Sequence, residues 1–103
     1  MQQCLSAENT RLDIELNRVY NKFMKKMKKD TSPDGLEIVK RIKDAENAWI
    51  KFRDTSCSLD GATMLVGTGQ SLVVVGCLNK MTDDRTKYIL GLEQTFGPDG
   101  GAL

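Results

Sequence analysis

The chain has 103 residues, of which 40% are hydrophobic and 28% are charged, and this composition is typical of a single globular domain. Fifteen basic residues against fourteen acidic ones leave a net charge of +1, which argues against a general nucleic-acid-binding protein. The sequence contains no histidine, so we expect neither a zinc site nor ordinary hydrolytic chemistry.

The first predicted element is an amphipathic helix from about residue 5 to residue 29. Its apolar residues recur at spacings of three, four and seven, and comprise Leu5, Leu12, Leu16, Val19, Tyr20, Phe23 and Met27. Acidic residues lie early in this segment and a cluster of lysines lies late, the order that the helix dipole favours. We interpret the lysine cluster as a solvated helix end rather than a phosphate-binding patch.

A second helix is predicted from about Pro33 to Cys57, after the break "DTSPDG". Ser32 is suited to cap this helix and Pro33 to occupy its first position. The apolar stripe comprises Leu36, Val39, Ile42, Ala45, Trp49, Phe52 and Ser56. Because the connection is short, we expect the first two helices to be antiparallel neighbours, with Trp49 and Phe52 in the core.

A long glycine-rich loop is predicted over residues 58–70, "SLDGATMLVGTGQ". Loops of this length in a compact domain are often functional or mobile. Met64, Leu65 and Val66 could cover the end of the core or offer a surface to a partner, and Asp60 is the charged residue of the loop.

The third predicted helix runs from about Ser71 to Thr95. Three successive valines weaken the helical pattern, and Thr82 could cap a second helical piece, so this helix could be broken. The tail, residues 97–103, is rich in glycine and we expect it to be flexible, which leaves residues 1–96 as one domain. The sequence therefore predicts an all-α fold, an antiparallel bundle of three helices.

The three cysteines should converge on one end of such a bundle. In an up-down arrangement the start of the first helix, the end of the second and the start of the third lie together, which places Cys4, Cys57 and Cys77 near one another. A Cys57–Cys77 disulfide would stabilise the fold by about 3 kcal/mol, and Cys4–Cys77 is the next pairing. Three buried thiols are the alternative. A disulfide would indicate an oxidising compartment.

Two arginines lie on or beside the predicted apolar stripes. Arg53 is adjacent to the stripe of the second helix, and Arg85 lies within that of the third. A half-buried guanidinium needs an acceptor, for which Asp54 and Asp13 are candidates. We interpret Arg53, Asp54 and Arg85 as a structural polar clamp between helices, with a preorganised patch for a partner as the alternative.

Four blocks of the sequence carry a family likeness: "MQQC", "LDIELNRVYNKFMKKM", "AWIKFRDTSC" and "CLNKMTDDRTKYILGL". The positions that match are Leu16, Asn17 and Tyr20, then Trp49, Arg53, Asp54 and Cys57, and finally Cys77, Leu78, Thr82 and Arg85. In order and spacing the chain resembles the LprI-type lysozyme-inhibitor domain family of bacterial envelope and secreted proteins. Many relatives carry a further cysteine upstream of the position of Cys4, which is missing here.

The resemblance implies an all-α, exported and often cross-linked domain, without enzymatic activity or cofactor, whose named activity is the inhibition of lysozyme. We expect a periplasmic or secreted location, with any signal peptide removed, since none is visible in "MQQCLSAEN" and no apolar run is long enough to span a membrane. The expected partner is a protein, lysozyme or another cell-wall hydrolase.

Two other functions remain open on the sequence: a periplasmic interaction or immunity module that neutralises another secreted toxin, and a structural envelope protein. Charge does not decide between them, because the cysteine-bearing end has seven acidic and six basic residues. Catalysis is disfavoured, since the adjacent Asp83 and Asp84 would point about 100° apart on a helix and form no dyad.

Overall fold

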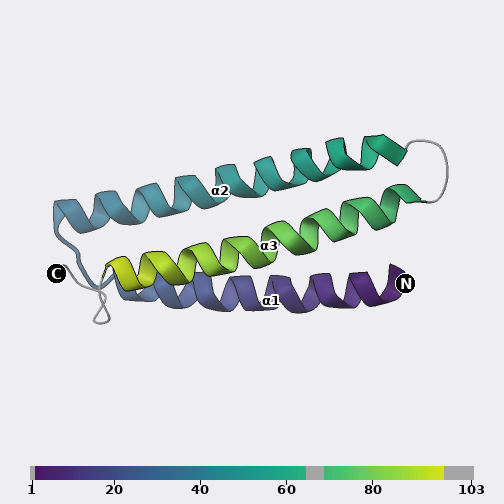
Figure 1. Cartoon of the computed structure of the whole chain (residues 1–103). Helices are drawn as coiled ribbons and strands as arrows, with labels where there is room; N and C mark the ends of the chain where they lie inside the picture. Colours follow the sequence, from purple (N-terminus) through teal and green to yellow (C-terminus); the bar gives the residue numbers. More distant parts are fainter. Residues whose placement is uncertain (1, 65–68, 97–103) are drawn as a thin grey trace.

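The computed structural model describes residues 2–64 and 69–96, with side chains from Ala7 onward. Three long helices form an antiparallel, all-α bundle, as predicted (Figure 1). They are α1 (Gln2–Met27), α2 (Pro33–Gly61) and α3 (Gly69–Thr95), and a short 3₁₀-helix, η1 (Ala62–Met64), follows α2. The bundle is elongated, with principal extents of 54, 21 and 15 Å.

Helix α3 holds the bundle together. It packs along both α1 and α2, whereas α1 and α2 contact each other over a short stretch only. Figure 1 shows α2 diverging from the other two helices toward the α1–α2 turn. The prediction that α1 and α2 are antiparallel neighbours is therefore correct in direction, but α3 forms most of the interface.

The core lies on the inner face of α1. Its buried members recur at helical spacing and meet one residue from each of the other helices: Leu16, Val19, Phe23, Met24 and Met27 from α1, Val39 from α2 and Ile89 from α3. The ring of Phe23, which is 1% exposed, lies 6.1 Å from that of Phe96. The stripe predicted for the first helix is thus confirmed from Leu12 onward.

Three apolar positions of the stripe predicted for α2 are exposed: Leu36, Ala45 and Phe52. Phe52 is 61% exposed and Leu36 is 59% exposed, although both were assigned to the stripe that packs on the core. The reason is geometric. Helix α2 is covered mainly along one line, by α3, so residues at the edges of a broad apolar stripe stay in contact with solvent.

The α1–α2 turn has the predicted cap. The Ser32 hydroxyl accepts a hydrogen bond from the Gly35 amide at 3.2 Å, and the Ser32 amide donates to Asp30 Oδ1 at 3.0 Å. Pro33 occupies the first turn, where its missing N–H costs nothing. These bonds satisfy amides that would otherwise lack a partner at the helix start.

The predicted loop over residues 58–70 is too long. Residues 58–61 continue α2, residues 62–64 form η1, and residues 69 and 70 already belong to α3. Helix α3 is continuous, so the break near Thr82 that the sequence left open does not occur. Packing against two helices outweighs the weak helix propensity of the valine run. Leu65, Val66 and the tail 97–103 lie outside the described residues.

In the ranges 2–64 and 69–96, no helix combines the length and the hydropathy that a membrane crossing requires.

Candidate functional site

A disulfide closes one end of the bundle. Cys57 near the end of α2 is bonded to Cys77 near the start of α3, and their Cα atoms are 5.5 Å apart. The Sδ atom of Met81 lies 3.7 Å from the Cys57 sulfur and 4.0 Å from that of Cys77, and Cys57 is fully buried. The first-choice pairing from the sequence is confirmed, and Cys77 is therefore not available to Cys4.

The helix ends converge as the up-down topology predicts. The start of α1 lies at the same end of the molecule as the end of α2 and the start of α3 (Figure 1). The position of Cys4 is in the first turn of α1, and its side chain lies outside the described residues. We call this end of the bundle the stapled end.

Large apolar side chains are exposed on α2 and η1 toward the stapled end. Leu59 is 72% exposed and Met64 is 40% exposed, and Asp60 beside them is exposed as well. Phe52 lies seven residues before Leu59, hence on the same face of α2. We define Phe52, Leu59, Asp60 and Met64 as the stapled-end surface.

The sequence placed two of these four residues, Asp60 and Met64, in a candidate contact region. It missed Leu59 because the second helix was expected to end at Cys57, and it missed Phe52 because that residue was assigned to the core. A helix extended by one more turn would have put both on one outward face, and both side chains are exposed.

Arg53 contacts both neighbouring helices near the middle of the bundle. Its Nε donates to Asp54 Oδ1 at 2.9 Å, and its Nη1 lies 3.7 Å from Asp13 Oδ1 and 3.4 Å from the Thr82 hydroxyl. Arg53 on α2 therefore contacts both α1 and α3. Both carboxylates proposed from the sequence are its partners.

Arg85 pairs with Glu46, a carboxylate that was not among its predicted partners. Its Nε donates to Glu46 Oε1 at 3.0 Å, and the two side chains are only 14% and 10% exposed. Both candidate partners named from the sequence, Asp13 and Asp54, contact Arg53 instead. A signal existed, because Glu46 lies three residues before Trp49 and seven before Arg53, on the face that packs inward.

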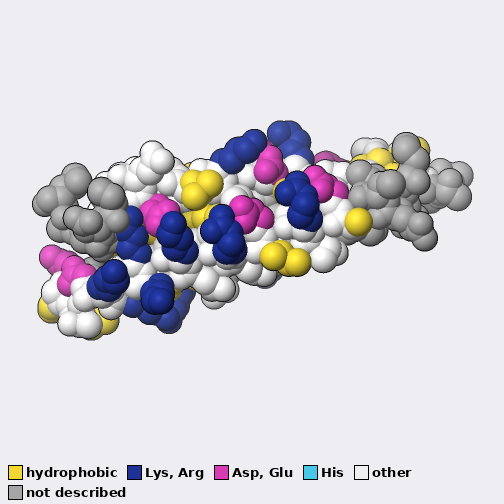
Figure 2. Space-filling model, turned by 90° about the horizontal axis from the view of Figure 1, so that it is seen from below, with side chains coloured by type: hydrophobic (Ala, Val, Ile, Leu, Met, Phe, Trp, Pro, Cys, Tyr) yellow, Lys and Arg dark blue, Asp and Glu magenta, His cyan; other side chains and the backbone are white. Residues whose placement is uncertain are grey.

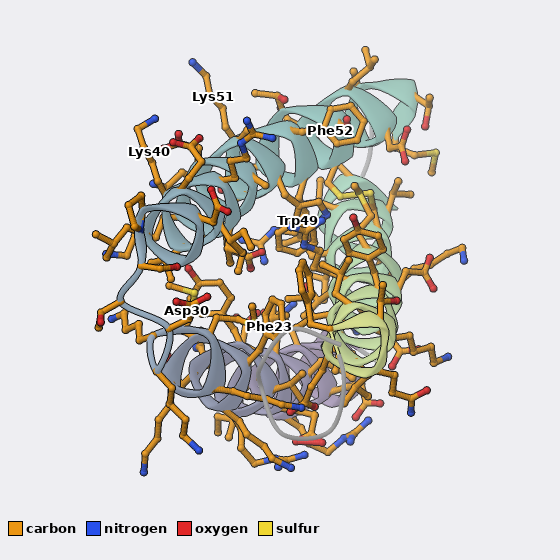
Figure 3. All side chains as sticks on the ribbon, turned by 90° about the vertical axis from the view of Figure 1, so that its left-hand side faces the viewer. Phe23, Asp30, Lys40, Trp49, Lys51 and Phe52 are labelled. Carbon is orange, nitrogen blue, oxygen red and sulfur yellow. A yellow bond between two sulfur atoms is a disulfide. The ribbon has the colours of Figure 1, made fainter. Side chains whose placement is uncertain are left out.

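Trp49 joins the two arginines. The guanidinium carbon of Arg53 lies 5.2 Å from the centre of the indole ring and that of Arg85 lies 5.4 Å from it. Arg85 also lies 4.9 Å from the ring of Tyr88. These cation–π contacts orient both guanidinium groups, and Figure 3 shows Trp49 directed between the helices.

A groove opens between the three helices at the end opposite the disulfide. Its volume is about 320 Å³, and α2 diverges from α3 there. Its apolar walls are formed by Phe23, Ile38, Ile42, Ala45, Ile89, Leu92 and Phe96, and its polar groups belong to Tyr20, Arg41, Glu46, Arg85 and Tyr88. Burial, followed by the negative charge of Glu46, raises the pKa of the Tyr20 hydroxyl.

Charge is distributed unevenly between the two ends. Residues 20–46 and 85–96, which form the groove end, contain ten basic and six acidic residues. The remaining described residues contain five basic and seven acidic ones, so the groove end carries +4 and the rest −2. Figure 2 shows Lys and Arg side chains over the face seen from below, most of them in its left half, toward the groove end.

Within the part of the chain that the structure describes, no group of three carboxylate or thiol side chains is arranged to hold a metal ion.

The fold and these features define a small, disulfide-bonded helical bundle with exposed apolar side chains at one end and a groove at the other. The sequence model described as "Lysozyme inhibitor LprI" matches residues 1–89, and the chain belongs to this family. A relative from Rhizobium meliloti (strain 1021), named uncharacterized protein R02472, is 29% identical over 98 residues, which cover 89% of this chain and 70% of the relative. No solved structure matches the chain.

Proposed function

We propose that this protein acts outside the cytoplasm and inhibits a lysozyme, or a related enzyme that degrades the cell wall, by direct protein–protein contact. The observation that carries the proposal is membership of the LprI family, because the family match covers residues 1–89 and therefore nearly all of the described fold. Inhibition by contact requires no catalytic group in the inhibitor.

The disulfide supports a location outside the cytoplasm. Cys57 and Cys77 join α2 to α3, and disulfides of this kind persist in oxidising compartments and are rare in the cytosol. The cross-link also holds the end of α2 and the start of α3 in a fixed relation. A contact surface held in this way loses less conformational entropy when it binds.

The stapled-end surface is the part of the molecule best suited to contact the enzyme. Phe52, Leu59 and Met64 are exposed apolar side chains, and grouped residues of this kind mark protein-binding surfaces. Asp60, the neighbour of Leu59 in the chain, is exposed as well, and the residues outside the groove end carry a net charge of −2. Typical lysozymes are basic, and complementary charge accelerates association.

The proposal is tested by mixing the purified protein with a lysozyme and following the clearing of a cell-wall suspension. We expect the clearing rate to fall as inhibitor is added and to level off at a defined molar ratio. Undiminished clearing at a large molar excess, with several wall-cleaving enzymes, would contradict the proposal.

A matched pair of variants tests the surface. Leu59→Ala removes an exposed apolar side chain from the stapled-end surface, and Leu36→Ala removes one from the opposite end of the same helix. We expect Leu59→Ala to weaken inhibition about tenfold, the size of effect that an interface anchor of more than 1 kcal/mol produces, and Leu36→Ala to leave it unchanged. Equal inhibition by both variants would assign the contact to another surface.

A further inference from the structure

The groove opposite the disulfide has the properties of a small-molecule site. Its volume of about 320 Å³ lies at the lower end of the range found for ligand pockets, which are mostly apolar with a few placed polar groups. Side chains from all three helices line it, including Phe23 from α1, Ile42 from α2 and Leu92 from α3. It is separate from the stapled-end surface and from the disulfide.

The polar groups of the groove are held in place by contacts within the bundle. Arg85 is bonded to Glu46 and lies against the rings of Trp49 and Tyr88, so its guanidinium is oriented before any ligand arrives. A guanidinium has five N–H donors, more than a single carboxylate oxygen accepts. Arg85 can therefore donate to a second acceptor that enters the groove.

The charge around the groove favours an anion. Arg41 and Arg85 line the groove together with a single carboxylate, Glu46. Arg41 also forms an exposed ion pair with Glu37, which is not among the lining residues. The end of the bundle that contains the groove carries a net charge of +4, and this field extends over the mouth. The positive potential would not strengthen the binding of a neutral or cationic amphiphile.

We propose that this groove binds a small anionic amphiphile, a single alkyl chain with a carboxylate head. The chain would lie against Ile38, Ile42 and Leu92 in the apolar part, and the head would face Arg41 or Arg85. A fatty acid of medium length has this chemistry. The site is independent of the proposed inhibition of lysozyme, since it lies at the other end of the bundle.

The direct test is isothermal titration of the full chain with three ten-carbon probes: decanoate, decanol and decyltrimethylammonium, each below the concentration at which it forms micelles. We expect decanoate to bind at one molecule per chain, at least tenfold more tightly than decyltrimethylammonium, with decanol between them. Absence of saturable decanoate binding, or equal affinity for the anion and the cation, would overturn the proposal.

Two substitutions to tryptophan test whether the ligand binds in the groove. Ala45 and Ala48 are both exposed on α2, but only Ala45 lines the groove. Ala45→Trp should fill the groove and weaken decanoate binding at least tenfold, whereas Ala48→Trp should leave the affinity within twofold of the original. An equal effect of the two variants would mean that decanoate binds elsewhere and would overturn the assignment.

A second matched pair tests the head group without altering the groove's shape. Arg41 lines the groove and Lys43, also exposed on α2, does not. We expect Arg41→Gln to weaken decanoate binding about threefold to tenfold and decanol binding not at all, and Lys43→Gln to have a smaller effect on decanoate. If Arg41→Gln weakened the binding of decanoate and decanol equally, the proposed role of charge in binding the head group would be overturned.

The other plausible occupant is a second copy of this chain, and sedimentation velocity distinguishes it. The proposal expects a monomer at micromolar concentration, with or without decanoate. A dimer that Ala45→Trp dissociates and Ala48→Trp does not would show that the groove is an interface between copies, and would overturn the proposal.

Discussion

Trp49 packs against the core and contacts both arginines. Its indole contacts the guanidinium groups of Arg53 and Arg85, and each of these is held by a carboxylate. Arg53 reaches Asp13 on α1 and Thr82 on α3, so the short stretch "AWIKFRDTSC" contacts both other helices and ends at the disulfide. These contacts explain why this stretch contains an aromatic ring, an arginine, a carboxylate and a cysteine within ten residues.

The Glu46–Arg85 pair should contribute to stability because it is shielded from solvent. Glu46→Ala leaves the Arg85 guanidinium poorly solvated without its partner, and we expect it to lower the free energy of unfolding by about 3 kcal/mol. Glu37→Ala, which breaks the exposed pair with Arg41, should cost less than about 0.5 kcal/mol. Urea unfolding followed by circular dichroism measures both. Similar losses in the two variants would contradict the buried role of Glu46.

Truncation of two phenylalanines should change the stability of the protein by very different amounts. Phe23 is buried at the centre of the core, so Phe23→Ala should cost about 3–5 kcal/mol by loss of apolar burial and creation of a cavity. Phe52 is largely exposed, and Phe52→Ala should change stability by no more than about 0.5 kcal/mol. Thermal unfolding distinguishes them, and a large loss for Phe52→Ala would restore its assignment to the core.

At the scale of elements, α2 differs from its neighbours in how little of it is covered. It is the longest of the three helices, it packs mainly on α3, and it diverges from the bundle toward its start. Its contact with the α1–α2 turn is tight, since a Cβ atom at Gly35 would overlap the carbonyl oxygen of Asp30.

Glycine-to-alanine substitutions in α2 and α3 should change the free energy of unfolding in opposite directions. Gly35→Ala should destabilise the protein by about 1–3 kcal/mol, because the turn must move to accommodate the methyl group. Gly91→Ala in α3 meets no atom within 4 Å and should stabilise by about 0.5–1 kcal/mol through its better helix propensity. Thermal unfolding of both variants measures the difference. Stabilisation by Gly35→Ala would show that the turn is not constrained.

At the scale of the whole molecule, the two ends of the bundle differ in construction. The stapled end is cross-linked and exposes apolar side chains on α2 and η1, while the opposite end is basic and contains the groove. Because the molecule is 54 Å long, a partner at one end and a ligand at the other would not compete for space. The two proposals can therefore be tested separately.

The disulfide should contribute to global stability. It closes a loop of 20 residues, and removal of such a cross-link costs about 3 kcal/mol on the chain-entropy estimate. We expect the double variant Cys57→Ser/Cys77→Ser to lose this amount in urea unfolding, and the native chain to lose a similar amount when a reductant is added. The double variant should not respond to reductant. Unchanged stability on removal of the bond would contradict the prediction.

The sequence by itself determined the local features of the molecule. The helical spacing of apolar residues in α1, the Ser32–Pro33 start of α2 and the pairing of Cys57 with Cys77 were all predicted, because each depends on residues close in sequence or on the order of helices along the chain. The carboxylates that contact Arg53 were among the predicted candidates, since Asp54 is its neighbour and Asp13 lies on another helix of the bundle.

Only the tertiary structure decided how far each face is covered. Whether Phe52 and Leu36 are buried depends on where α3 crosses α2, and the groove exists because α2 diverges from α3 over its first half. The pairing of Arg85 with Glu46 likewise joins residues 39 positions apart. Periodicity identifies the face of a helix that is apolar, but the distance and angle between helices, which set burial and cavities, arise from packing of the whole chain.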